Sequence, residues 1–164
     1  MTEPVVLRPP AHRVSRTAIG YWTVRAAIGW LVLAVFQASW LVGTSALFGL
    51  RVALLATTVV VAAGHLVVMP RWRYRVHRWE VTDLAVYTQT GWFSQERRIA
   101  PISRIQTVDS EFGALERLFG LANVTVTTAS AAGPIRIHGL DRDTVNQLVA
   151  QLTSTTAATP GDAT

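Results

Sequence analysis

Two long apolar runs separated by only four residues constrain this chain more than any other feature. The runs cover residues 21–42 and 47–69, and as a helix the first, with 22 residues, would extend about 33 Å. That length exceeds the roughly 30 Å hydrocarbon core of a bilayer. We therefore predict transmembrane helices over residues 18–42 and 47–69, joined by an extracytoplasmic turn at 43–46 that makes them antiparallel neighbours.

The apolar excess is local. Half of the residues are hydrophobic and 15% are charged, whereas soluble domains carry about 25% charged residues. Residues 26–50 and 52–69 contain no Arg, Lys, Asp or Glu. A signal peptide is the alternative for the first run, but that run is longer than a typical signal-peptide core and a second run follows directly.

Charge placement predicts the orientation. All fifteen basic residues are Arg, and residues 1–79 hold nine of them against one acidic residue, a net charge of +8, while residues 80–164 carry −3. Arg8, Arg13 and Arg16 precede the first span, and four more Arg follow the second. The positive-inside rule then places both termini in the cytoplasm, in a multi-pass protein of the bacterial inner membrane. Basic residues gathered at membrane flanks argue against a nucleic-acid partner.

Aromatic and polar side chains refine this prediction. Aromatic residues expected to anchor at the membrane interfaces are Tyr21, Trp22 and Trp72 on the inner side and Trp40 on the outer side. Gln37 and His65 fall at different depths, so each is expected to bond to the facing helix rather than to the other. A pore or carrier subunit would need a helix face lined with polar residues. The two spans contain few polar residues, so this function ranks last.

Beyond the spans the pattern changes to that of a small α+β domain over residues 71–153. Alternating apolar residues predict strands, and turn residues between them predict antiparallel hairpins; the strands are expected at 84–89, 94–100, 123–129 and 135–138. Asp141 is a candidate N-cap for a closing amphipathic helix. Residues 1–17 are expected to form a cytoplasmic tail and residues 154–164 a disordered one.

Several motifs in this part of the chain resemble the bacterial pleckstrin-homology-like (PH-like) domain of the membrane-flanked type. They are the segment Pro101-Ile102-Ser103-Arg104-Ile105-Gln106-Thr107-Val108, then Gly113, Leu115, Arg117, Phe119-Gly120-Leu121-Ala122, Val124, Val126, Thr128 and Gly139-Leu140. The resemblance covers roughly residues 20–153. It implies a seven-stranded, bent, mostly antiparallel sheet or partly open barrel capped by a C-terminal helix. The family often has paired glycines where this chain has residues 129–133, which leaves that loop conformation open.

The juxtamembrane segment is the first candidate site. Its basic residues are Arg71, Arg73, Arg75, His77 and Arg78. As a strand, the segment would place the first four on one face, where they would bind the inner membrane surface or an anionic lipid headgroup. The alternative is that these residues only fix the topology. A second candidate is an anion or partner groove formed by Arg97, Arg98 and Arg104, with ion pairing across strands as its alternative.

Catalysis and bound cofactors find little support in the sequence. There is no Cys, and the four His are scattered along the chain, so we predict no catalytic residue, no metal site, no cofactor and no enzymatic activity. The preferred function is a membrane-anchored PH-like scaffold that engages another membrane protein, or itself through small residues on the helices. Recognition of anionic lipid headgroups by the juxtamembrane Arg is the alternative.

Overall fold

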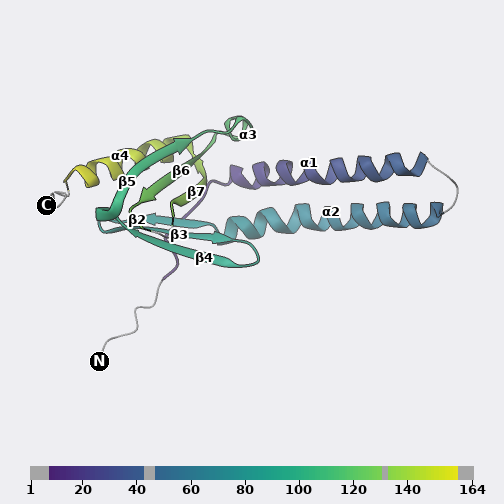
Figure 1. Ribbon diagram of the computed structural model, residues 1–164, viewed down its shortest axis with the longest axis horizontal. Coiled ribbons are helices and arrows are strands. Elements are labelled where there is room, and N and C mark those ends of the chain that lie inside the picture. The colour runs from purple at the N-terminus through teal and green to yellow at the C-terminus, as the bar shows by residue number, and fades with distance from the viewer. Residues whose placement is uncertain (1–7, 43–46, 131–132, 159–164) are drawn as a thin grey trace, which may run out of the picture.

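The structure, a computed structural model, describes residues 8–42, 47–130 and 133–158 (Figure 1). The predicted turn at 43–46 lies outside the described residues, as do the ends of both predicted tails. In chain order the elements are β1 His12–Arg13, α1 Thr17–Ser39, η1 Trp40–Val42, α2 Phe48–Val76, β2 Arg78–Val81, β3 Ala85–Gly91, β4 Gln95–Pro101, η2 Ile102–Arg104, β5 Ile105–Glu111, α3 Ala114–Leu118, β6 Leu121–Thr128, β7 Ile135–Asp141 and α4 Arg142–Ala158.

The two long helices lie side by side and project from one end of the β domain (Figure 1). Helices α1 and α2 have 23 and 29 residues, and an 18-residue stretch within each has a mean hydropathy of 1.6 and 2.3, so both are long and apolar enough to cross a membrane. Few of their residues are buried in the protein, unlike those of a core helix. Their apolar side chains therefore face outward along most of their length, which suits a lipid environment.

The sequence predicted that the second helix ends at Met69, before Pro70. Helix α2 instead continues through Pro70 to Val76. Proline removes one backbone hydrogen bond from a helix interior. Other contacts stabilise the helical conformation of the residues that follow Pro70. Arg71 donates to the Val67 carbonyl at 2.7 Å, and Val76 is buried in the domain. The predicted strand over residues 71–78 is therefore wrong, because strand geometry begins only at Arg78.

Seven antiparallel strands form two sheets among the described residues, of order β1-β2-β3-β4 and β5-β6-β7. Strands β3, β4, β6 and β7 confirm the four strands predicted from alternation. The core lies between the sheets and α4, where Val145, Leu148 and Leu152 of the helix are buried. Helix α4 continues to Ala158, so the prediction of a disordered tail is wrong for residues 154–158.

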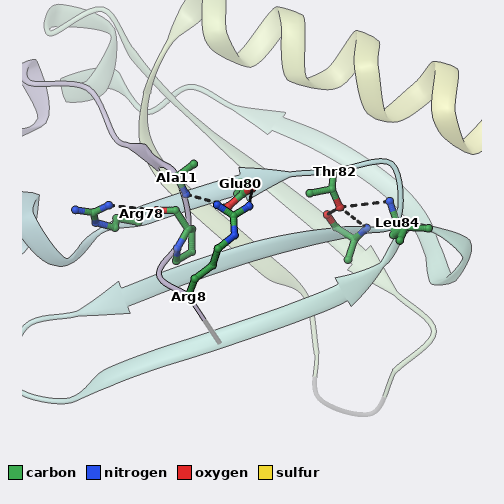
Figure 2. A network of polar contacts seen from close by, with 8 residues as sticks. Arg8, Ala11, Arg78, Glu80, Thr82 and Leu84 are labelled. Atoms are coloured by element: carbon green, nitrogen blue, oxygen red, sulfur yellow. Dashed lines mark hydrogen bonds and ion pairs between the residues drawn. The ribbon is translucent and has the colours of Figure 1, made fainter. Parts of the chain in front are cut away.

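The N-terminal segment is part of the domain rather than a free tail. Strand β1 pairs with β2, and the Glu80 carboxylate accepts hydrogen bonds from the Arg8 guanidinium and, at 3.0 Å, from the Ala11 backbone N–H (Figure 2). Arg78 donates to the Pro10 carbonyl at 3.3 Å. Segment 8–13 is thereby held against β2, with β1 as the outer strand of the first sheet, which corrects the predicted tail for these residues.

The start of α1 is also built into the core. Ala18, Tyr21 and Trp22 are 0%, 8% and 3% exposed, so the last two are core residues and not the interface anchors that the sequence suggested. Close approach at Gly139 makes this possible: the glycine has a φ of +76°, and a Cβ there would lie 3.1 Å from that of Ala18. A larger residue at this position would push α1 away from β7.

Candidate functional site

A cavity of about 430 Å³ opens between the edge strands β4 and β7, beside the last turn of α2. We call it the seam pocket. Strands β4 and β7 belong to different sheets and form no ladder with each other in the part of the chain described. The charged and titratable side chains that line it are Arg73, His77, Glu96, Arg98, Arg136 and His138.

Helix α2 supplies Arg73, and its C-cap is His77, four residues later and therefore on the same helix face. The Arg73 guanidinium carbon lies 4.7 Å from the centre of the Trp22 ring, a favourable cation–π distance. Arg73 Nε also lies 3.4 Å from His77 Nε2. The aromatic ring from α1 thus holds this cation at the wall of the pocket.

Both histidines of the pocket are held in their neutral form. Burial, followed by the nearby Arg73 charge, lowers the pKa of His77 to about 4, against a smaller opposing effect of the hydrogen bond to the Arg73 carbonyl. Burial likewise lowers the pKa of His138, with Arg73 again adding to the effect. At neutral pH the pocket lining therefore carries three Arg against one carboxylate, Glu96, and two uncharged imidazoles.

Strands β4 and β7 place the other two arginines on facing edges. Arg98 Nε donates to the Glu96 carboxylate at 2.6 Å, and its Nη1 donates to the Pro134 carbonyl at 3.1 Å. Arg136 is exposed on β7 between the buried Ile135 and Ile137. Arg136 was not among the site residues predicted from the sequence, although its alternation with two isoleucines is the signal that would have placed it on the outer face.

The five predicted juxtamembrane residues do not form one ladder. In a helix, residues two apart point in different directions, and only Arg73 and His77 reach the seam pocket. Arg71 and Arg75 are exposed on α2, while Arg78 contacts the N-terminal segment. The expectation that four of these side chains share one face is wrong because the segment is helical.

The second predicted group does come together. Arg97, Arg98 and Arg104 line a groove of about 310 Å³ that runs toward the Pro101 end of β4, together with Thr128 and Ser130, so Arg98 lines both this groove and the seam pocket. We call it the distal groove. The acidic neighbour Glu96 pairs with Arg98 along the same strand rather than across strands.

The long helices also carry two predicted interface tryptophans and two polar residues that were expected to bond to the facing helix. Trp40 and Trp72 are 58% and 50% exposed, at opposite ends of the helix pair. Trp30 of α1 donates to His65 Nδ1 of α2 at 3.0 Å, which confirms the expectation that His65 bonds to the facing helix. Gln37 differs: its buried side-chain oxygen has no hydrogen-bond partner among the described residues.

Two antiparallel sheets closed by a C-terminal helix and carried on two apolar helices form a membrane-associated PH-like protein. The chain matches the family described as "Bacterial PH domain" over residues 17–156, and it belongs to that family. This match begins at the first residue of α1, so it includes both long helices.

One curated relative is the UPF0699 transmembrane protein YdbS of Bacillus subtilis (strain 168), which is 31% identical over 86 residues, 49% of this chain and 54% of that protein. The match thus spans about half the length of the relative. No solved structure is significantly similar to this chain.

Proposed function

We propose that this protein is a membrane-anchored binding module that recognises the anionic headgroup of a membrane lipid in the seam pocket, on the cytoplasmic face. The observation that carries the proposal is the convergence of Arg73, Arg98 and Arg136, from three different elements, on one cavity. Arginine binds phosphate through paired N–H donors. The neutral imidazoles of His77 and His138 add hydrogen-bonding groups without adding charge.

The depth of the pocket supports a lipid as the ligand. Arg73 follows Met69, the last residue of the apolar run, by four positions, or about 6 Å along a helix. The polar headgroup layer occupies about 5–8 Å on each side of the hydrocarbon core. The guanidinium at the pocket wall therefore lies at headgroup level, where each juxtamembrane Arg near an anionic surface contributes about 1 kcal/mol.

Native mass spectrometry tests the proposal with the full chain released from nanodiscs containing equal amounts of phosphatidylglycerol and phosphatidylcholine. We expect the wild type to retain phosphatidylglycerol preferentially. The variant Arg73→Gln/Arg136→Gln removes two charged donors, and because a hydrogen bond to a charged group is worth about 1.5 kcal/mol or more, retention should fall at least roughly tenfold.

A matched control removes the same charge elsewhere. Arg97→Gln/Arg104→Gln changes the distal groove but keeps Arg98, which lines both cavities. Because neither Arg97 nor Arg104 lines the seam pocket and exposed charges are screened by salt, this variant should leave the retained lipid ratio within a factor of about two. The proposal fails if the wild type shows no preference for phosphatidylglycerol. It also fails if both double variants lose the preference equally.

Engagement of another membrane protein is the second candidate, favoured by the uncovered apolar sides of α1 and α2. Phe36 and Val60 are 69% and 72% exposed, and the distal groove offers a basic surface at the edge of the first sheet. Self-association through small residues on the same helices is a variant of this hypothesis. Crosslinking in native membranes that recovers a stoichiometric protein partner, without enriched anionic lipid, would favour it over lipid recognition. Either role is one of binding, not catalysis.

A further inference from the structure

The loop that joins β3 to β4 carries aromatic side chains outside the two long helices. Gly91 pairs with Gln95, so the loop consists of Trp92, Phe93 and Ser94, and we call these three residues the hairpin tip. Short loops between strands usually carry small or polar residues. Here two aromatic residues occupy the loop, and Phe93 is 92% exposed.

The hairpin tip is fixed against α2. Trp72 Nε1 donates to the Trp92 carbonyl at 3.0 Å. The Trp92 ring lies 5.9 Å from the His65 ring and 4.5 Å from the Phe93 ring, which stacks on it at an interplanar angle of 20°. Figure 1 shows the loop end of β3 and β4 beside the domain-proximal part of α2.

These contacts set the depth of the tip. His65 lies within the apolar run and Trp72 just beyond it, about 10 Å apart along a helix. The tip thus lies beside the last turns of the membrane-spanning segment rather than beyond them. Between tip and helix is an apolar groove of about 330 Å³, lined by Val68, Met69, Trp72, Trp92 and Phe93.

We infer that the hairpin tip inserts into the bilayer interface and that lipid acyl chains of the domain-proximal leaflet fill this groove. The groove is continuous with the outward apolar surface of α2, since Val67 and Val68 on that helix are 55% and 59% exposed. Aromatic rings with one polar edge favour the membrane interface. An exposed Phe beside them gains by leaving water.

The domain is therefore held at three points, two helices and one loop, so the orientation of the seam pocket relative to the membrane surface is fixed. Trp92 lines both the seam pocket and the apolar groove. The inserted loop and the headgroup pocket thus share one wall. Insertion does not depend on the proposed headgroup binding, because the tip carries no charge.

Site-directed spin labelling tests the inference directly. The chain contains no Cys, so Phe93→Cys gives one labelled position in the full-length protein. The matched control is Leu84→Cys: Leu84 is 81% exposed and lies next to the other end of β3. Both proteins are reconstituted into neutral phosphatidylcholine vesicles, where headgroup charge plays no part.

We expect the label at position 93 to collide frequently with oxygen, which concentrates in the bilayer, and to be protected several-fold from an aqueous nickel reagent relative to the label at position 84. Equal access of the nickel reagent to both labels would overturn the inference. A label at position 93 shielded from both reagents would also overturn it, since protein and not lipid would then cover the tip. Either result would leave the test of headgroup binding unaffected.

Discussion

Removing the N-terminal segment and both helices should unfold the β domain, although the sequence places that domain entirely within residues 71–153. The perturbation is a fragment of residues 71–158. It lacks β1 and four core side chains, Val14, Ala18, Tyr21 and Trp22, none of which is more than 8% exposed. It also lacks Ser15, whose backbone N–H donates to the Gly139 carbonyl at 2.8 Å and whose hydroxyl donates to Asp141 at 2.6 Å.

The magnitude follows from burial. Burying one large apolar side chain stabilises a fold by about 1.5–3 kcal/mol and one methyl by about 0.8 kcal/mol. The four side chains therefore contribute about 5–10 kcal/mol, less whatever part of this surface the unfolded chain already buries. A domain of this kind is stable by about 5–15 kcal/mol in total. The fragment therefore loses a large part of its stability, and we expect a weak near-ultraviolet circular dichroism spectrum and no cooperative urea transition.

The matched control restores the missing residues without the spans. In it, residues 8–24 are joined to residues 70–158 by a flexible Gly/Ser linker, which returns the strand and all four side chains. We expect cooperative unfolding and a strong aromatic spectrum from this protein. If the fragment of residues 71–158 alone shows the same spectrum and the same urea midpoint, the reasoning that α1 completes the core is refuted.

Two further predictions concern the charges of the seam pocket. Glu96→Gln releases Arg98 from an exposed ion pair worth about 0.2–1 kcal/mol, so phosphatidylglycerol retention should rise by about 1.4-fold to fivefold in the same mass-spectrometric assay. An unchanged ratio would contradict the role given to this pocket. The pKa of His77 is lowered to about 4 in the folded protein from an ordinary value of 6.5, so folding favours its neutral form and the stability present above pH 6.5 is lost as the pH falls toward 4. The thermal midpoint in nanodiscs should drop over this window, and His77→Gln should flatten the drop; equal slopes for both proteins would count against it.

The local sequence pattern was enough to predict those helices and strands that have a regular spacing of apolar residues. The two spans, the four strands predicted from alternation and the family resemblance all follow from side-chain order, because a lipid-facing helix and a half-buried strand each impose their own period on the sequence. The grouping of Arg97, Arg98 and Arg104 followed for the same reason, since the first two are neighbours on one strand and the third follows its end closely.

Contacts between segments distant in the sequence determined the end of α2, the packing of the N-terminal segment and the seam pocket. The sequence around Pro70 gives a helix-breaking signal, yet packing of Val76 against the domain carries α2 through it, which turned a predicted strand into a helical turn and separated Arg71 from Arg73. The burial of Trp22 and the pairing of β1 depend on residues more than fifty positions away, and no local pattern carries that information. The seam pocket has the same origin: its arginines come from α2, β4 and β7, and only the closure of two sheets around the base of α2 brings three like charges to one cavity.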